Sequence, residues 1–247
     1  EEFLGVDPAR APIPVLPAVH YTMGGIIADG LTASTLPGLY SAGECSSVGI
    51  HGANRLGSNS LTELLVFGKV AGVQAAAFAK NAPEGRAATL NHLAEQARDR
   101  AMAVVERRGG TERLATLRRE MAQTMEDGCG IYREAATMQA TCDKLVELKE
   151  RLVHVKLDDQ SRGWNTEWLL AIELGYQLDV AQAIAYSALN RRESRGSHQR
   201  LDGYGERDDV NFLRHSLAYY VADGPPRIEY QPVRITRSQP GTRAYGA

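Results

Sequence analysis

The chain has 247 residues, a formal net charge of -2, 43% hydrophobic residues and 23% charged residues. These values are typical of a soluble globular protein of one large or two ordinary domains. Acidic and basic residues are interspersed, so the charge pattern excludes a basic surface for nucleic acid. The cysteines, Cys45, Cys129 and Cys142, are far apart and form no metal-binding motif, which favours a reducing compartment without structural zinc.

The chain opens with EEFLGVDPARAPIPVLP, a proline-spaced segment without an initiator methionine. We interpret it as an entry into the middle of a domain, so we expect a fragment of a longer polypeptide. The most apolar run, Leu61 to Ala79, is interrupted by Glu63 and Lys69. Because a bilayer span needs about 20 mostly apolar residues, we predict a buried helix for this run.

The texture of the sequence changes twice along the chain. Residues 1–80 are rich in glycine, and VHYTMGGIIAD and GLYSAGE are typical of strands or strand ends, followed by a helix from about Ser58. Residues 81–190 are predicted to be helical, and short loops between the helices favour a small bundle. Residues 191–247 are dense in charge and glycine, and RIEYQPVRIT alternates like a strand, which favours a small α+β tail.

Apolar spacing and glycine stops predict the helices of the bundle. They are expected over Leu90 to Val105, over Leu114 to a stop at Gly128, over Met138 to Leu152, after Asn165-Thr166, and after a cap at Asp179.

The tail carries a charged run that could form a second site or a structural network. We favour a salt-bridge network that joins the tail to the rest of the protein. The segment GYGERD resembles a dinucleotide fingerprint but lacks its third glycine and follows no strand, so we predict a turn. The charged run of the tail consists of Arg195, His198, Arg200, Asp202, Arg207, Asp208 and Asp209.

The stretch GECSSVGIHGANRLGSNSL is the strongest candidate for a binding site. Glu44 follows a short apolar strand, where ligands of open sheets sit and a carboxylate can accept hydrogen bonds from hydroxyls. Ser58, Asn59 and Ser60 are good N-cap residues, and the free N–H groups of a helix start bind anions. The alternatives are an acid in a surface turn and a helix that is merely well capped.

Arg55 lies between Gly52 and Gly57, and its guanidinium can hold a carboxylate with two parallel hydrogen bonds. Taken alone, His20 and His51 are each more typical of structural histidines. Cys45 follows Glu44 directly, and we expect a small buried thiol there.

Together, HYTMGG, GLYSAGECSSVGIHGANRLGSNSL and ELLVFGKVAG resemble the flavoprotein subunit of fumarate reductase and succinate dehydrogenase. The likeness continues through EDGCGIYR, ELKERL, ESRGSHQR and ERDDVNFLRH, so it covers the whole chain. It implies an α/β plus α fold: the C-terminal part of an FAD-binding Rossmann-like domain (1–80), a helical bundle domain (81–190) and a small α+β domain (191–247).

The resemblance also implies the cofactor and the reaction. His20 and Arg55 would be catalytic, holding a C4 dicarboxylate for hydride transfer between flavin N5 and the C2–C3 unit of fumarate or succinate. The family's GxGxxG fingerprint, flavinylated histidine, proton-delivering arginine and capping domain lie upstream, so we expect this chain alone to be inactive. The implied FAD-binding residues are His20, Tyr21, Glu44, Arg55, Leu56, Gly57, Ser58, Asn59, Ser60 and Leu61.

The implied partners are the N-terminal remainder of the flavoprotein, an iron–sulfur subunit and, indirectly, membrane anchor subunits that serve a quinone. Such a chain would lie peripherally on the cytoplasmic face of the inner membrane. The GYGERDDVNFL segment favours the fumarate reductase group. A succinate dehydrogenase flavoprotein, an L-aspartate oxidase with its similar HGANR segment, and a helical interaction domain without enzymatic activity are the alternatives.

Overall fold

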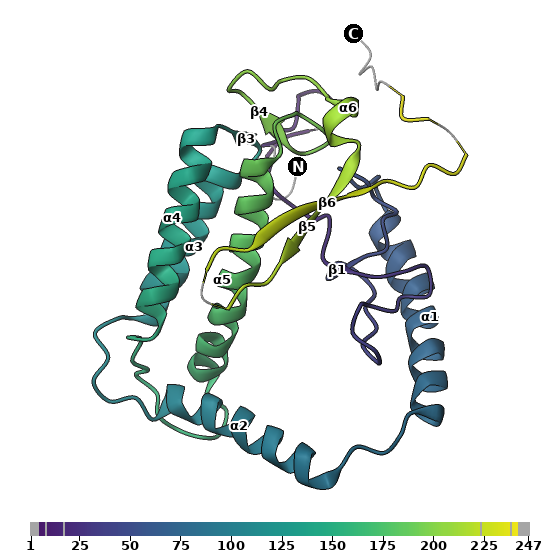
Figure 1. Cartoon of the computed structure of the whole chain (residues 1–247). Coiled ribbons are helices and arrows are strands. Elements are labelled where there is room, and N and C mark those ends of the chain that lie inside the picture. The colour runs from purple at the N-terminus through teal and green to yellow at the C-terminus, as the bar shows by residue number, and fades with distance from the viewer. Residues whose placement is uncertain (1–4, 8, 17, 223, 238, 242–247) are drawn as a thin grey trace. The chain divides into compact units, whose positions relative to one another are not determined.

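The computed structural model describes residues 5–7, 9–16, 18–222, 224–237 and 239–241 (Figure 1). The chain divides into two compact units, unit 1 (Glu1–Ala77) and unit 2 (Phe78–Ala247). The division into three domains stays a prediction.

Unit 1 is built on a short parallel strand pair, β1 (Ile26–Ile27) and β2 (Ser46–Ser47). The strands are shorter than the sequence predicts, because glycines with positive φ interrupt the extended backbone next to them. Gly25 has a φ of 131°, and a Cβ there would lie 2.4 Å from the Cys45 carbonyl oxygen. The glycine therefore lets the two strands approach each other.

Helix α1 (Asn59–Asn81) follows β2 and begins one residue after the predicted start. The prediction that it is buried is wrong, since Glu63 is its one buried residue and Leu65 is 77% exposed. In the described part of unit 1 the buried residues are Gly43 and polar residues, so no apolar layer packs against the helix. Among the described residues α1 alone is long and apolar enough to cross a membrane, and one such helix is weak evidence of a span. The buried polar residues are Thr32, Ser41, Ser46 and Glu63.

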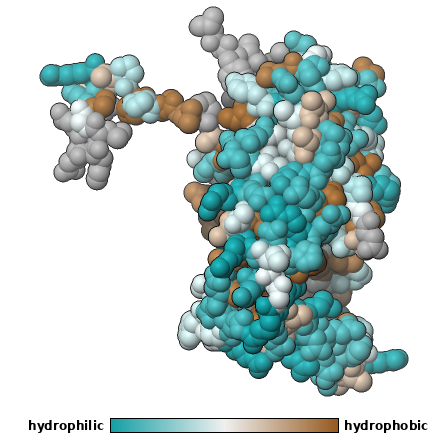
Figure 2. Space-filling view, turned by 90° about the vertical axis from the view of Figure 1, so that its left-hand side faces the viewer, coloured by the Kyte–Doolittle hydropathy of each residue, from teal (hydrophilic) through white to brown (hydrophobic). Residues whose placement is uncertain are grey.

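Unit 2 is a helical bundle in which α3, α4 and α5 pack against one another (Figure 1). The apolar residues recur at helical spacing, so each helix turns one face inward. The predicted helices that begin near Leu90, Leu114 and Met138 are confirmed as α2, α3 and α4. The side on which α4 lies in Figure 1 is mostly hydrophilic (Figure 2). The helices are α2 (Ala87–Val105), α3 (Leu114–Cys129), α4 (Ala135–Leu152) and α5 (Thr166–Asn190). The fully buried apolar residues include Leu117, Met138, Cys142, Leu145, Leu148, Leu174 and Leu178.

The prediction of two helices between residues 165 and 190 is wrong, because α5 is continuous. Asn165 caps its start, since its side-chain oxygen accepts a hydrogen bond from the Trp168 N–H at 2.8 Å. Asp179 lies inside the helix rather than at a cap. Its carboxylate is satisfied by Lys149 Nζ of α4 at 2.5 Å, so it has no need to bond to the helix backbone.

The tail of unit 2 is small and mixed, with a parallel and an antiparallel strand pair. The strand predicted in RIEYQPVRIT is confirmed over β6. The GYGERD segment, predicted to be a turn, forms neither helix nor strand. The elements of the tail are β4 (Gln199–Arg200), α6 (Asp209–Phe212), and β5 (Arg214–Tyr219) paired with β6 (Arg227–Pro232). β4 pairs with β3 (Tyr132–Arg133), which lies between α3 and α4.

Gly128 provides a test of the packing between α3 and α4. A Cβ at this buried position would lie 1.9 Å from Thr141 Oγ1, so we expect Gly128→Ala to lower the free energy of unfolding by about 1–3 kcal/mol. Urea unfolding followed by circular dichroism measures the change. Gly109→Ala, in open space, is the matched control. Equal stability of the two variants would contradict the packing argument.

Candidate functional site

The centre of the candidate site is Glu63, whose side chain is 2% exposed. Its Oε2 accepts hydrogen bonds from His51 Nε2 at 2.6 Å and from the Tyr21 hydroxyl at 3.3 Å. These residues come from the segment before β1, the loop after β2 and the second turn of α1. We call Tyr21, His51, Arg55 and Glu63 the Glu63 cluster.

Arg55 completes the cluster by stacking on an aromatic ring. Its Cζ lies 4.4 Å from the centroid of the Tyr21 ring, a cation–π arrangement. Nη1 donates to the Leu56 carbonyl oxygen at 3.2 Å. Nε is buried and has no hydrogen-bond partner in the described part of the chain. Buried polar groups are almost always satisfied, so this nitrogen is an exception within the described part of the chain.

The protonation of Tyr21 suits its role in the cluster. Burial of the phenol raises its pKa, and the neighbouring Glu63 carboxylate raises it further. The hydroxyl therefore keeps its proton near neutral pH and acts as a hydrogen-bond donor.

The remaining predicted site residues lie around this cluster and are mostly exposed. Glu44 is exposed, and its Oε1 accepts a hydrogen bond from the Thr22 N–H at 2.9 Å, beside Tyr21 in the chain. His20, on the other side of Tyr21, is exposed and makes no hydrogen bond to another described residue. The structure thus brings Tyr21 and Arg55 into contact, whereas His20 makes no such contact within the described ranges.

The segment 56–61 leads from Arg55 into α1. Its backbone is strained at Ser58, a non-glycine residue with a φ of 66°. The prediction that Ser58, Asn59 or Ser60 caps the helix is not borne out, because none of these side chains forms a hydrogen bond within the described part of the chain. Instead, the Asn59 N–H donates to the Leu56 carbonyl oxygen at 3.2 Å. Leu56, Gly57, Ser58, Asn59 and Leu61 are exposed, and Ser60 is half-buried.

The structure adds Glu63 to the site and corrects Cys45. Sequence reasoning took Glu63 for an interruption of an apolar run, although an acid in such a run is buried only when donors satisfy it. The interpretation of His51 as structural agrees with its bond to Glu63. Cys45 is exposed rather than buried, because it lies with the exposed Glu44 in the turn that precedes β2.

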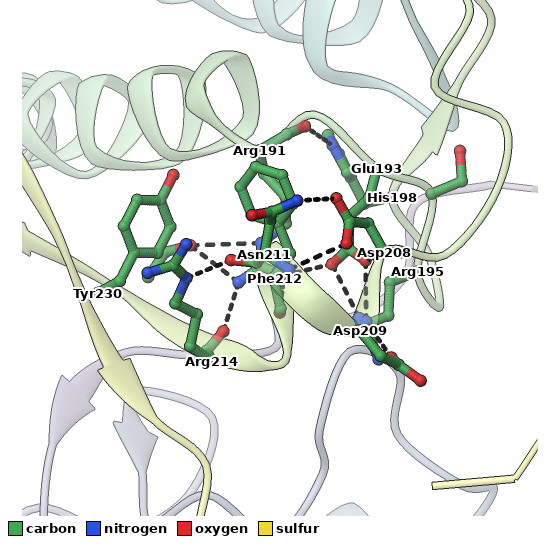
Figure 3. Close-up of polar contacts among 12 residues, drawn as sticks. Arg191, Glu193, Arg195, His198, Asp208, Asp209, Asn211, Phe212, Arg214 and Tyr230 are labelled. Carbon is green, nitrogen blue, oxygen red and sulfur yellow. Dashed lines mark hydrogen bonds and ion pairs between the residues drawn. The ribbon is translucent and has the colours of Figure 1, made fainter.

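The charged run of the tail forms a network around Glu193, which has no exposed side-chain surface (Figure 3). Arg191 Nη1 and Arg195 Nε donate to its Oε1 at 2.5 and 2.8 Å. The backbone N–H of Asp208 donates to Oε2 at 2.9 Å, and Arg195 Nη2 also binds Asp209 at 2.7 Å. Arg207 Nη2 also pairs with Asp209 at 2.9 Å, and the Asp208 carboxylate accepts from the backbone N–H groups of Val210 and Asn211.

Two further contacts join this network to the bundle. Asp202 accepts from the backbone N–H of Ala135, at the start of α4, and from Arg200 Nη2. His198 accepts a hydrogen bond from Arg133 Nη1 on Nδ1 at 2.9 Å and donates from Nε2 to the Arg191 carbonyl oxygen at 3.0 Å. The predicted network is confirmed in part: its ion pairs lie within the tail, and the contacts that join it to the bundle are hydrogen bonds.

Two protein-family models match the chain. Residues 118–245 match the fumarate reductase flavoprotein C-terminal family, and residues 1–61 match an FAD binding domain. The chain belongs to the fumarate reductase flavoprotein C-terminal family. This confirms the resemblance seen in the motifs, and the FAD binding model agrees with the expected cofactor.

Individual relatives of this flavoprotein family agree with the match. The fumarate reductase flavoprotein subunit of Proteus vulgaris is 53% identical over 99% of this chain and 41% of the relative. The succinate dehydrogenase flavoprotein subunit of Coxiella burnetii is 40% identical over 95% of this chain and 40% of the relative. The chain therefore spans about two fifths of the length of these relatives.

A solved structure shows the same fold. A variant of Escherichia coli quinol fumarate reductase matches with a TM-score of 0.91 and 52% identity, over 97% of this chain and 41% of that chain. The helical and mixed α/β character of the expected fold is thereby confirmed.

The His198 contacts predict how stability depends on pH. Burial, together with the nearby Arg133, Arg200 and Arg191 charges and against the hydrogen bond to the Arg191 carbonyl oxygen, lowers the pKa of His198 from an ordinary value of 6.5 to about 4. Between these two values the unfolded chain binds a proton that the folded chain does not, so stability falls as the pH falls from about 6.5 to about 4. The full effect is on the order of 3 kcal/mol.

Urea unfolding at several pH values measures this dependence. His198→Gln is expected to flatten the slope between about pH 4 and 6.5. His92→Gln, on the surface of α2, is the matched control and should keep the slope. An unchanged slope in His198→Gln would show that other groups cause it.

Proposed function

We propose that this chain is the C-terminal portion of a fumarate reductase flavoprotein and that unit 1 supplies one wall of its FAD and dicarboxylate site. The observation that carries the proposal is Arg55, whose guanidinium is stacked on Tyr21 and whose buried Nε has no partner in the described residues. The complete flavoprotein interconverts fumarate and succinate, and FAD supplies the hydride chemistry.

The exposed residues of unit 1 fit the flavin. The start of α1 carries partial positive charge, which stabilises the electron-rich N1/O2 edge of an isoalloxazine. Gly57 has open space around it, so the backbone of the segment before α1 can approach a flat ring. Glu44 presents a carboxylate that can accept hydrogen bonds from ribityl hydroxyls. The proposed FAD-binding residues are His20, Tyr21, Glu44, Arg55, Leu56, Gly57, Ser58, Asn59, Ser60 and Leu61.

Arg55 and His20 suit a dicarboxylate substrate. A guanidinium presents its donors in a rigid plane that matches a carboxylate. Within the described residues no carboxylate pairs with the Arg55 guanidinium. His20 is exposed next to Tyr21 and can donate to a second carboxylate. Holding both carboxylates fixes the reacting carbons and draws electron density from the double bond, which favours hydride attack.

The N-terminal remainder of the flavoprotein is the proposed partner of unit 1. The exposed apolar residues of α1, such as Leu61, Leu65 and Val73, need a cover, and the polar buried residues of unit 1 form no apolar core. That remainder would also bring the dinucleotide fingerprint, the covalent flavin linkage and the proton donor. In this proposal the chain is divided into three domains: the C-terminal part of an FAD-binding Rossmann-like domain (1–80), a helical bundle (81–190) and a small tail domain (191–247).

The electron path is proposed from the complexes of relatives. The similar Escherichia coli structure is a quinol fumarate reductase by name. We place this chain in a comparable complex, where an iron–sulfur subunit exchanges electrons with a quinone through membrane anchor subunits. The flavoprotein would lie peripherally on the cytoplasmic face of the membrane.

The second candidate is a succinate dehydrogenase flavoprotein. The 40% identity to the Coxiella burnetii subunit favours it, and Arg55 and His20 would serve both directions of the reaction. An L-aspartate oxidase would differ by oxidising an amino acid. Assays with fumarate, succinate and L-aspartate on the complete protein separate the three.

Arg55→Lys in the complete flavoprotein tests the proposed function. An ammonium group cannot reproduce the planar, two-point hold on a carboxylate, so we expect kcat/KM for fumarate to fall by about 100-fold or more. Fumarate reduction by a reduced dye is measured at matched FAD content. Arg192→Lys, an exposed arginine of the tail, is the control. Normal kinetics in Arg55→Lys would contradict the proposal that Arg55 holds a dicarboxylate substrate.

His20→Ser tests the second donor. We expect the Kd of malonate or oxaloacetate to rise by about tenfold, because one hydrogen bond to a charged carboxylate is lost. Titration of the flavin absorbance measures the affinity, and His92→Ser is the matched control. An unchanged affinity would return His20 to a structural role.

A further inference from the structure

We infer that Glu63 is a positioning residue that holds Arg55 in place through Tyr21 and His51. The inference rests on the proposed function, because it concerns the same Arg55 guanidinium. It adds a residue outside the substrate- and FAD-binding sets, since Glu63 is buried and its acceptor oxygen is used within the chain.

Glu63 Oε2 is a single point at which two side chains meet. The Tyr21 hydroxyl and His51 Nε2 both donate to this one oxygen, across 42 and 12 residues of the chain. Because α1 fixes the backbone of Glu63, the oxygen is an anchor on a rigid element for two residues of irregular segments. A group anchored on a helix is held more precisely than one carried by a loop alone.

The contacts continue from this anchor to Arg55. The Tyr21 and His51 rings meet edge to face, with centroids 5.9 Å apart and an interplanar angle of 89°. The hydroxyl bond and the ring contact therefore restrain Tyr21 in position and in tilt. Arg55 lies over this restrained ring, with Cζ 4.4 Å from the ring centroid, so the position of the guanidinium depends on the position of the phenol.

The arrangement holds Arg55 without neutralising it. Among the described residues no carboxylate lies within ion-pair distance of Arg55, and the Glu63 charge is met by the donors of Tyr21 and His51 instead. A direct ion pair would orient the arginine equally well, but it would use the donors that a substrate carboxylate needs. An aromatic layer between acid and base keeps these donors available.

A purely structural role explains the cluster less well. Replacing a whole buried polar cluster by apolar residues of similar size is often neutral or stabilising, so stability alone does not require the Glu63, Tyr21 and His51 combination here. The unpartnered Arg55 Nε lies at the far end of the same chain of contacts. The cluster thus ends at a guanidinium that stacks on Tyr21 and whose hydrogen bond within the described residues is to the Leu56 carbonyl oxygen.

The experiment is a double-mutant cycle between Glu63 and Arg55 in the complete flavoprotein. Glu63→Leu is expected to lower kcat/KM for fumarate by about 30- to 100-fold, mainly through KM, at unchanged FAD content. Glu63→Gln keeps an acceptor oxygen and should remain within about fivefold of the wild type. Lys69→Leu, at an exposed charge on the same helix, is the matched control.

The Arg55→Lys background decides whether Glu63 acts through Arg55. If it does, adding Glu63→Leu to Arg55→Lys should cost less than about threefold more, because the group that it positions is already gone. Full additivity of the two losses would overturn the inference. If Glu63→Leu does not fold, Tyr21→Phe removes only the tethering hydroxyl, and an unchanged KM in that variant would overturn the inference too.

Failure of the inference differs from failure of the proposed function. If the wild-type flavoprotein converts neither fumarate nor succinate, the proposed function is wrong. If the wild type is active and Arg55→Lys is impaired while the Glu63 losses are additive, only the positioning role of Glu63 is wrong.

Discussion

The shared acceptor at Glu63 is the contact on which the geometry of unit 1 depends. It joins the segment before β1, the loop after β2 and helix α1 at one buried oxygen. Burying a carboxylate is costly unless donors satisfy it, so these three segments are mutually dependent. If either donor moves away, the buried acid loses a partner, and the cluster is therefore favoured as a whole or not at all. The position of Arg55 depends on the same contacts, because Arg55 stacks on the Tyr21 ring.

Each of the two units is stabilised internally by a different physical effect. In unit 2, Leu145, Leu148, Leu174 and Leu178 are fully buried at the contacts of α4 and α5, and apolar burial dominates. The buried side chains of unit 1 are polar instead, and contacts such as the hydrogen bond between the Ser41 and Ser46 hydroxyls order its loops. An apolar core tolerates changes that conserve volume, whereas hydrogen-bond networks depend on particular atoms. A site built on the second kind of support is precise, and it leaves the apolar residues of α1 exposed.

Sequence periodicity was enough to predict the helices of unit 2, because each has an apolar face with regular spacing. It failed at Asp179, since an acid within a helix resembles a cap until its partner Lys149 is known. Burial of α1 could not be predicted from composition, because burial depends on what packs against a helix. The candidate site was found through the resemblance of its motifs. Its geometry was not, because the Tyr21–Glu63 contact joins residues 42 positions apart, and nothing local in the sequence specifies that pairing.

The unsatisfied features of unit 1 lie close together in the chain. Arg55 Nε is buried without a partner in the described residues, and Ser58 has a left-handed backbone. Five residues after Ser58, Glu63 has donors on its buried oxygen and sits in a regular helix. Strain and unmet hydrogen bonding persist in folded proteins where the surroundings impose them, and they gather at binding sites. Here Glu63, whose buried oxygen accepts two hydrogen bonds, holds Arg55 in position through Tyr21. A carboxylate bound by Arg55 would therefore meet a donor set already in place, and little of its binding energy would be spent on ordering the protein.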